Sequence, residues 1–370
     1  MEKSDEQVRE AIAKFGYDIY DLKEYDYDLP KEQIAQTPAA KRDESRLLVI
    51  DRDTGEYRDE KYFRNIINYL KPGDVVVRNN TKVIPARLIG VKEGTGAHVE
   101  LLLLRQIKEE GDVWECLTGN AHTVKVGTVV DFGEGKLKAE CTAVLDEGLR
   151  KFRFIYQGIF LEVLDELGRM PLPPYITSQV APNDRYQTVY AKIEGSAAAP
   201  TAGFHFTPEL FDAMRAKGVE VLDVTLHVGL GTFRPVKTDD IREHHMHSEW
   251  YHMDQAVADE LNRAKDEKRR IIAIGTTSIR TLETIAHLNN GRFKGCSGDT
   301  ALFIYPGFNW LAVDAAVTNF HLPKSTLIML VASFTSREHI LAAYQHAVKS
   351  GYRFFSFGDA MFIARHPFDR

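Results

Sequence analysis

The sequence predicts an α/β protein in which a small antiparallel β-barrel is inserted into a larger mixed α/β domain. Short β-rich runs separated by glycines fill residues 71–157 without an intervening helix. After residue 158, strands alternate with helices that carry clear start and stop signals. We therefore assign residues 1–70 and 158–370 to the α/β domain and residues 71–157 to the barrel. The 370 residues are enough for two domains.

The first 20 residues precede the domain pattern and form an N-terminal extension. Residues 5–16 predict a short amphipathic helix, because Val8, Ile12 and Phe15 share one face and Gly16 follows them. Termini are often untethered, so we expect a mobile or loosely docked extension rather than a functional arm.

The inserted domain is predicted from seven β-rich runs, each bounded by turn residues. Their regular spacing indicates an antiparallel barrel or sandwich. The runs are VVVR, ARLIGVK, HVELLLLRQI, VWECLT, VGTVVDF, LKAECTAVL and RKFRFIY.

Helix signals punctuate the second half of the chain. Thr207 is a predicted N-cap followed by Pro208, and Gly218 ends that helix. The next elements, in order, are a strand at 219–229, a helix starting at Asp254, a buried strand at 269–275, a helix at 276–286 and a helix start at Pro323.

Composition limits the functional classes. A hydrophobic content of 44% and a charged content of 27% are typical of a globular protein, and the net charge of −6 means that any RNA-binding surface must be local. The basic candidates are Lys41–Arg42 with Arg46, and 268–270. Three distant cysteines argue against a zinc site or a disulfide framework. A charged N-terminus and the lack of an 18-residue apolar run predict a cytoplasmic protein.

Small residues surround one histidine in the run GSAAAPTAGFHFT, from Gly195 to Thr207. Apolar packing at a period of two or 3.6 does not explain this run, and small residues allow a ligand to approach the backbone. The same combination of small residues with one histidine or arginine recurs in TLHVGLGTF, GTTSIRTLE and TNFHLPKS. Four such junctions predict one ligand site.

These runs belong to a longer, ordered set of motifs that resembles one known family. The further motifs are YDLP, PGDVVVRNNTKVIPARL, PLPPYI, DRYQTVYA and FFSFGDAM. The set resembles the S-adenosylmethionine:tRNA ribosyltransferase-isomerases of the queuosine pathway, from about Tyr27 to the C-terminus. The resemblance implies transfer of the ribosyl group of S-adenosylmethionine to 7-aminomethyl-7-deazaguanine at the tRNA wobble position. Epoxyqueuosine, adenine and methionine would result, with tRNA as partner and no metal or membrane; we expect a monomer.

The implied reaction needs a base for the ribose 5′-proton, and histidine suits this role at neutral pH. His205, His227 and His321 lie among small residues or at strand ends, and His205 is our first choice. Lys324 could bind phosphate or assist the departing adenine. For each of them the structural alternative is a satisfied core or surface residue.

The turn from Gly275 to Ser278 joins a buried strand to a helix, so its backbone N–H groups could hold an anion. We expect Thr276, Thr277, Arg280 and Asn319 to bind the co-substrate, although Thr277 or Ser278 could instead only cap the helix. Asn80 and Arg87 complete the binding set.

Two positions depart from the family pattern. Asn80 stands where an aspartate is expected, which removes a charge but keeps an acceptor oxygen. Thr177 stands where a basic residue usually follows PPYI, so one RNA phosphate contact would be lost. Tyr175, Tyr186 and Phe206 could stack on a base or pack in the core.

Two other functions compete with this hypothesis. The segment REHHMHSEWYH is dense in metal-ligand types but matches no closed zinc signature. A catalytically silent RNA-binding relative is the second alternative, suggested by Asn80 and Thr177.

Overall fold

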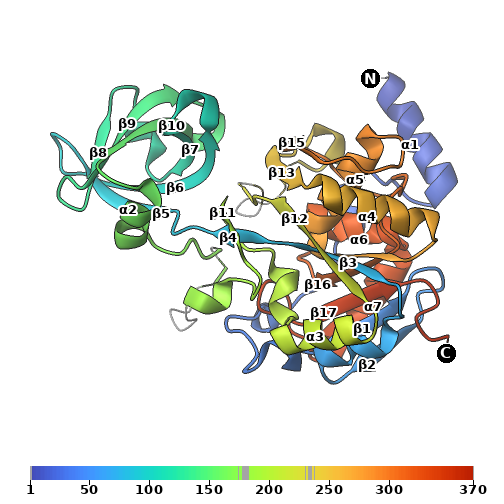
Figure 1. Ribbon diagram of the computed structural model, residues 1–370. Helices are drawn as coiled ribbons and strands as arrows, with labels where there is room; N and C mark the ends of the chain where they lie inside the picture. Colours follow the sequence, from blue (N-terminus) through green and yellow to red (C-terminus); the bar gives the residue numbers. More distant parts are fainter. Residues whose placement is uncertain are drawn as a thin grey trace.

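The computed structural model describes residues 2–173, 175–176, 183–229, 231, 236 and 238–369. These residues form a nine-stranded mixed sheet with helices on both faces and a closed six-stranded barrel. The barrel stands apart from the sheet at the far end of the molecule, and β4 (Thr81–Val83) and β11 (Ile193–Ser196) lie between them (Figure 1). The expected fold class is confirmed.

Parallel strands occupy the middle of the large sheet, and antiparallel pairs lie toward its edges. The strands β12, β3, β14 and β16 run parallel, and β17 runs antiparallel to β16. In sheet order the strands are β15 (Cys296–Thr300), β13 (Glu249–Met253), β12 (Glu220–Leu226), β3 (Val75–Asn79), β14 (Ile271–Ile274), β16 (Ala315–Asn319), β17 (Ala360–Ala364), β1 (Leu47–Asp51) and β2 (Tyr57–Glu60).

Successive side chains of the strands point to opposite faces of this sheet, and each face packs into a core cluster. Val75 and Val77 join the core cluster on one face, whereas Val76 joins the cluster on the other, as the two-residue repeat of a strand requires. The first cluster includes side chains of α4 (Gln255–Asp266), α5 (Gly275–Leu288), α6 (Thr326–Phe334) and α7 (Arg337–Lys349), and the second those of α3 (Pro208–Ala216) and the 3-10 helix η4 (Phe63–Tyr69).

The barrel closes on itself, which leaves no unpaired edge strand. Its strands are β5 (Arg87–Lys92), β6 (His98–Ile107), β7 (Val113–Thr118), β8 (Val129–Phe132), β9 (Leu137–Val144) and β10 (Leu149–Tyr156). Helix α2 (Phe160–Leu167) adds the buried Leu164 to the barrel core. The segment that enters the barrel and the segment that leaves it are hydrogen-bonded to each other. The backbone N–H of Arg87 donates to Arg169 O, and the N–H of Arg169 donates to Arg87 O.

Two expected boundaries differ from the structure. We expected the run at Val75 in the barrel domain, but β3 lies in the middle of the large sheet. A parallel strand buried on both faces has the same continuous apolar pattern as a short barrel strand, so the sequence does not separate them. The helix expected at Pro323 begins at Thr326, where Ser325 Oγ accepts from Ile328 N–H.

Other local signals are confirmed. Thr207 Oγ1 accepts from Leu210 N–H, which caps α3 as expected. The expected N-terminal helix is α1 (Glu2–Phe15), whose Ala11 is buried and whose Phe15 packs against the main core cluster. Within the part of the chain that the structure describes, no helix is both long and apolar enough to cross a membrane.

Candidate active site at the carboxyl edge of the sheet

The parallel strands bring most of the predicted site residues to one edge. Strands β3, β12, β14 and β16 all end there, and a predicted residue lies at the last position of each strand or within two residues after it. Those residues are Asn80, His227, Thr276 and Asn319. Crevices outside the carboxyl ends of strands are the usual ligand sites of open α/β sheets.

His205 ends the 3-10 helix η9 (Thr201–His205) and bonds through both ring nitrogens. Its Nε2 lies 2.6 Å from Asn319 Oδ1, and its Nδ1 lies 2.7 Å from Ser45 Oγ. The Asn319 amide donates to Thr201 Oγ1 and to the carbonyls of Phe355 and Ser356. The Asn319 oxygen must therefore face the ring, so Nε2 carries the proton and Nδ1 is the accepting nitrogen.

Burial determines the charge state of His205. The residue is 3% exposed and its ring stacks against Phe63 with centroids 5.0 Å apart. Loss of solvation lowers the pKa of His205 to about 4, and the bond to Asn319 offsets only part of that shift. His205 is therefore neutral at pH 7, with one nitrogen able to accept a proton.

His227 forms a second polar cluster at the same edge. Its Nδ1 lies 2.8 Å from Thr81 Oγ1, and its ring stacks on Trp250 with centroids 4.9 Å apart. Gly195 has a φ of +138°, and a Cβ there would meet His227 Nε2 at 2.7 Å. The small residue at the start of the 195–207 run therefore lets the backbone approach His227.

The first turn of α5 has no side-chain cap. Ile274 occupies the N-cap position and supplies no side-chain hydrogen bond, so the capping expected as the alternative role of Thr277 or Ser278 is absent. Thr277 Oγ1 and Ser278 Oγ are buried without a hydrogen-bond partner among the described residues. Ala202 of η9 is 3.4 Å from the position of a Cβ on Gly275, so this turn lies next to the segment that carries His205.

Asn80 and His321 are used in internal contacts at this edge. Thr225 Oγ1 donates to Asn80 Oδ1 at 2.7 Å, so the residue that replaces the expected aspartate is held as an acceptor. His321 is 5% exposed, and its Nε2 lies 2.9 Å from Thr318 Oγ1. Burial lowers the pKa of His321 to about 3.

Comparison with known proteins identifies the family. Residues 22–363 match the model of a family described as queuosine biosynthesis protein. The chain belongs to this family. The crystal structure of S-adenosylmethionine tRNA ribosyltransferase from Thermotoga maritima is similar to this chain, with 40% sequence identity and a TM-score of 0.53. The match covers 92% of this chain and 99% of that chain. The resemblance drawn from the motifs is thereby confirmed.

Arg280 of this queuosine family member is committed to an internal contact. Its guanidinium forms a buried ion pair with Glu249 and also donates to the carbonyls of Leu302 and Thr300. Glu249 accepts in turn from Gly229 N–H at 2.8 Å. We expected Arg280 to hold a ligand anion, but its donors already bind strand β13, the last residue of β15 and Leu302 beyond it.

Lys324 and Arg87 lie outside the two clusters. Lys324 Nζ is 2.8 Å from Asp26 Oδ2, its side chain is 47% exposed, and the bond to Asp26 raises its pKa. Arg87 lies on barrel strand β5, where its Nε is 3.3 Å from Glu100 and its Nη2 donates to Leu172 O. Among the described residues, neither cation forms a hydrogen bond or ion pair with the His205 cluster.

Two of the three aromatic candidates are core residues, and the third is partly buried. Tyr186 and Phe206 are fully buried, so the core alternative holds for both. Tyr175 shares a hydrogen bond with Ser356 Oγ and packs edge-on against Phe355 at 4.1 Å. Thr177 lies outside the described residues.

The histidine-rich segment does not gather ligands. His252 bonds to Ser297 and Asp254, whereas His244 packs against Phe303. Among the described residues, no group of three histidine, cysteine, aspartate or glutamate side chains is placed to hold a metal ion.

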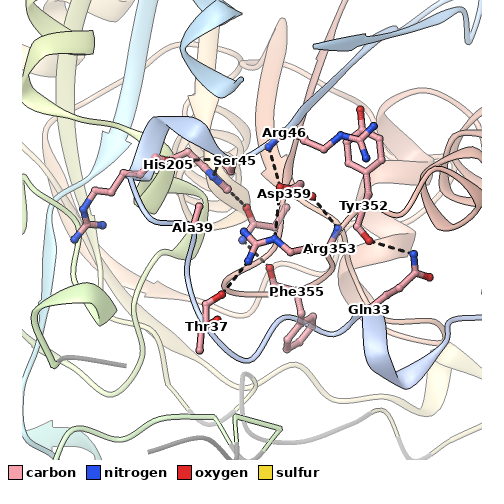
Figure 2. A network of polar contacts seen from close by, with 12 residues as sticks. Gln33, Thr37, Ala39, Ser45, Arg46, His205, Tyr352, Arg353, Phe355 and Asp359 are labelled. Carbon is pink, nitrogen blue, oxygen red and sulfur yellow. Dashed lines mark hydrogen bonds and ion pairs between the residues drawn. The ribbon is translucent and has the colours of Figure 1, made fainter. Parts of the chain in front are cut away.

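Sequence reasoning missed a pocket over the His205 cluster. Its cavity volume is about 20 Å³, and it is partly open to solvent. Figure 2 shows Ser45 and His205 in contact near Arg353, and Asp359 below them bonded to the backbone N–H groups of Arg46 and Arg353. The lining residues are Pro38, Ala39, Arg42, Ser45, Arg185, Phe204, His205, Arg353, Ser356, Phe357 and Gly358. The motifs DRYQTVYA and FFSFGDAM contain four of these eleven residues, but only the fold brings them to Ser45.

Proposed function

We propose that this enzyme transfers the ribosyl group of S-adenosylmethionine to 7-aminomethyl-7-deazaguanine at the wobble position of tRNA and isomerises it. The products are epoxyqueuosine in tRNA, adenine and methionine. Family membership makes the chain a transferase of this class and supports tRNA and S-adenosylmethionine as its substrates. The reaction takes place in the cytoplasm, and the enzyme acts as a monomer without a metal.

The observation that carries the proposal is the arrangement of Ser45, His205 and Asn319 beside the open turn of α5. Asn319 fixes the ring so that only Nδ1 can take a proton. The proton of the ribose 5′-carbon, which the adjacent sulfonium acidifies, passes to Nδ1 through Ser45 Oγ or after that hydroxyl has turned away. The imidazolium then donates to Asn319 Oδ1.

The first turn of α5 binds the methionine carboxylate. Its backbone N–H groups lack a side-chain cap, and the helix dipole favours negative charge there. Thr276 and Thr277 are half-buried at the entrance of this turn. Arg280 and Glu249 hold the helix in place from behind, so Arg280 positions the site without touching the ligand.

The His227 cluster binds the polar groups of the nucleoside. Thr81 fixes the His227 ring through a hydrogen bond, and the Thr225 hydroxyl donates to Asn80 Oδ1. His227 is the second candidate for the base. Lys324 and Arg87 contribute charge farther out, where each has a carboxylate partner.

The proposal is tested by incubating the protein with S-adenosylmethionine and tRNA bearing the aminomethyl-deazaguanine base. Mass analysis of the digested nucleosides should detect the epoxyqueuosine nucleoside, with adenine and methionine formed in equal amounts. A chelator should leave the yield unchanged. RNA binding without any change in nucleoside mass would instead support the silent relative, and activity lost to the chelator and restored by zinc would support the metal alternative.

A further inference from the structure

Three arginines from three different segments line the pocket above His205. Arg42 begins the 3-10 helix η3 (Arg42–Glu44), Arg185 lies in η8 (Asn183–Tyr186), and Arg353 precedes β17. All three are half-buried. No aspartate or glutamate is among the lining residues, but Asp359 Oδ1, outside the lining, lies 4.0 Å from Arg353 Nε. The convergence of three guanidinium groups on one small space is a feature of anion-binding sites.

Backbone carbonyls hold these side chains in place. Arg42 donates to Phe204 O, Arg353 donates to Thr37 O at 3.0 Å, and Arg185 donates to Ala39 O at 2.8 Å and Ala40 O at 3.3 Å. The Nε of Arg185 is buried and has no hydrogen-bond partner within the described residues. The arginines are therefore oriented before any ligand binds, which lowers the entropic cost of binding.

We infer that the pocket of Arg42, Arg185 and Arg353 binds a backbone phosphate of the RNA substrate. This inference rests on the proposed function and adds to it the position of one phosphate relative to the catalytic histidine. The pocket has a cavity volume of about 20 Å³ and is partly open to solvent, so it is too small to enclose a nucleotide base. It supplies a local positive surface on a chain whose net charge is −6.

The charge of the other substrate argues against the alternative ligand. S-adenosylmethionine carries a sulfonium, an ammonium and one carboxylate, so it is a net cation and three arginines would repel it. The second basic run is also less suitable. Arg269 and Arg270 precede β14 at the opposite edge of the sheet, and they are paired with Glu260, Glu220 and Asp74.

A phosphate in this pocket would also act on His205. The charged groups that face His205 are Arg353 and Arg42, which lower its pKa, and Asp359, which raises it. A bound phosphate would counter the two arginines and raise the pKa of His205 toward neutrality, where a general base works best. RNA binding would thus strengthen the base only when the substrate is in place.

Salt-dependent binding of an anticodon stem-loop RNA tests the inference without requiring turnover. Arg185→Ala should weaken RNA binding about tenfold or more and reduce the slope of log affinity against log salt by about 0.7 to 0.9. Arg185→Lys should keep most of the slope. Arg292→Ala is the matched control, because within the described residues this exposed arginine pairs only with Asp266 on α4. S-adenosylmethionine affinity should not change in any of these variants.

Equal RNA affinity and equal slope in wild type and Arg185→Ala would overturn the inference, as would a loss confined to S-adenosylmethionine binding. A second measurement uses the wild type and so does not depend on the folding of a variant. The imidazole signal of His205, assigned with His205→Asn, should titrate at a higher pH when the RNA is bound. An unchanged His205 titration would contradict the inference. Failure of the proposed function would appear separately, as intact RNA binding without product.

Discussion

Asn319 Oδ1 lies 2.6 Å from His205 Nε2, and this one contact decides which nitrogen of His205 can accept a proton. The amide of Asn319 is itself fixed by Thr201 and by two backbone carbonyls. The histidine is therefore oriented before substrate binds, as catalytic groups need to be.

Asn319→Asp should move the pH dependence of the reaction. A carboxylate beside Nε2–H stabilises the imidazolium, so it raises the pKa of His205 from about 4. Because the base must be unprotonated, the acid limb of the pH–rate profile should shift to higher pH in the variant. An unshifted acid limb in a folded variant would show that Asn319 does not act through His205.

The free energy of unfolding should fall as the pH is lowered from 7 to 4, because two buried histidines stay neutral in the folded state. The folded pKa values are about 4 for His205 and about 3 for His321, whereas the unfolded chain takes up protons near 6.5. Between these values the unfolded state binds more protons, so the free energy of unfolding decreases with falling pH, by about 3 kcal/mol from His205 alone. Urea unfolding at pH 7 and pH 4 measures this change.

The control for that experiment is His205→Asn, which cannot titrate in this range. Its free energy of unfolding should fall less over the same pH interval. An equal fall in both proteins would mean that His205 is not kept neutral by burial.

Arg280→Ala should destabilise the fold rather than abolish a ligand contact. Removal of the guanidinium leaves the Glu249 carboxylate, 6% exposed, without its cation, which costs about 3–5 kcal/mol. The double variant Arg280→Met with Glu249→Gln removes both charges, keeps an acceptor for Gly229 N–H and should lose much less. Weaker S-adenosylmethionine binding with unchanged stability would restore Arg280 as a direct ligand residue.

Local signals in the sequence predicted the elements but not their partners. The cap at Thr207 and the strand-to-helix turn at Gly275 depend on neighbouring residues, and both were predicted. The place of β3 depends on pairing with β12 and β14, which lie more than 140 residues away in the chain. That information is absent from a local apolar run.

The same limit applies to the site. The small residues around His205 marked it as a candidate, because apolar packing does not explain such a run. Ser45, 160 positions away, carries no such mark, and only the fold brings its hydroxyl to Nδ1. The ion pair of Arg280 could not be predicted, because its partner Glu249 lies on strand β13, far away in the sequence.

Exchange of the ribose 5′-hydrogens of S-adenosylmethionine in deuterium oxide, with tRNA present, tests most directly that His205 is the base. The wild type should exchange these hydrogens. His205→Ala should not, and its single-turnover rate should fall by roughly 10²–10⁴ while S-adenosylmethionine binding is retained. Exchange and turnover near the wild-type rate in His205→Ala would contradict the account and transfer the role to His227 or His321.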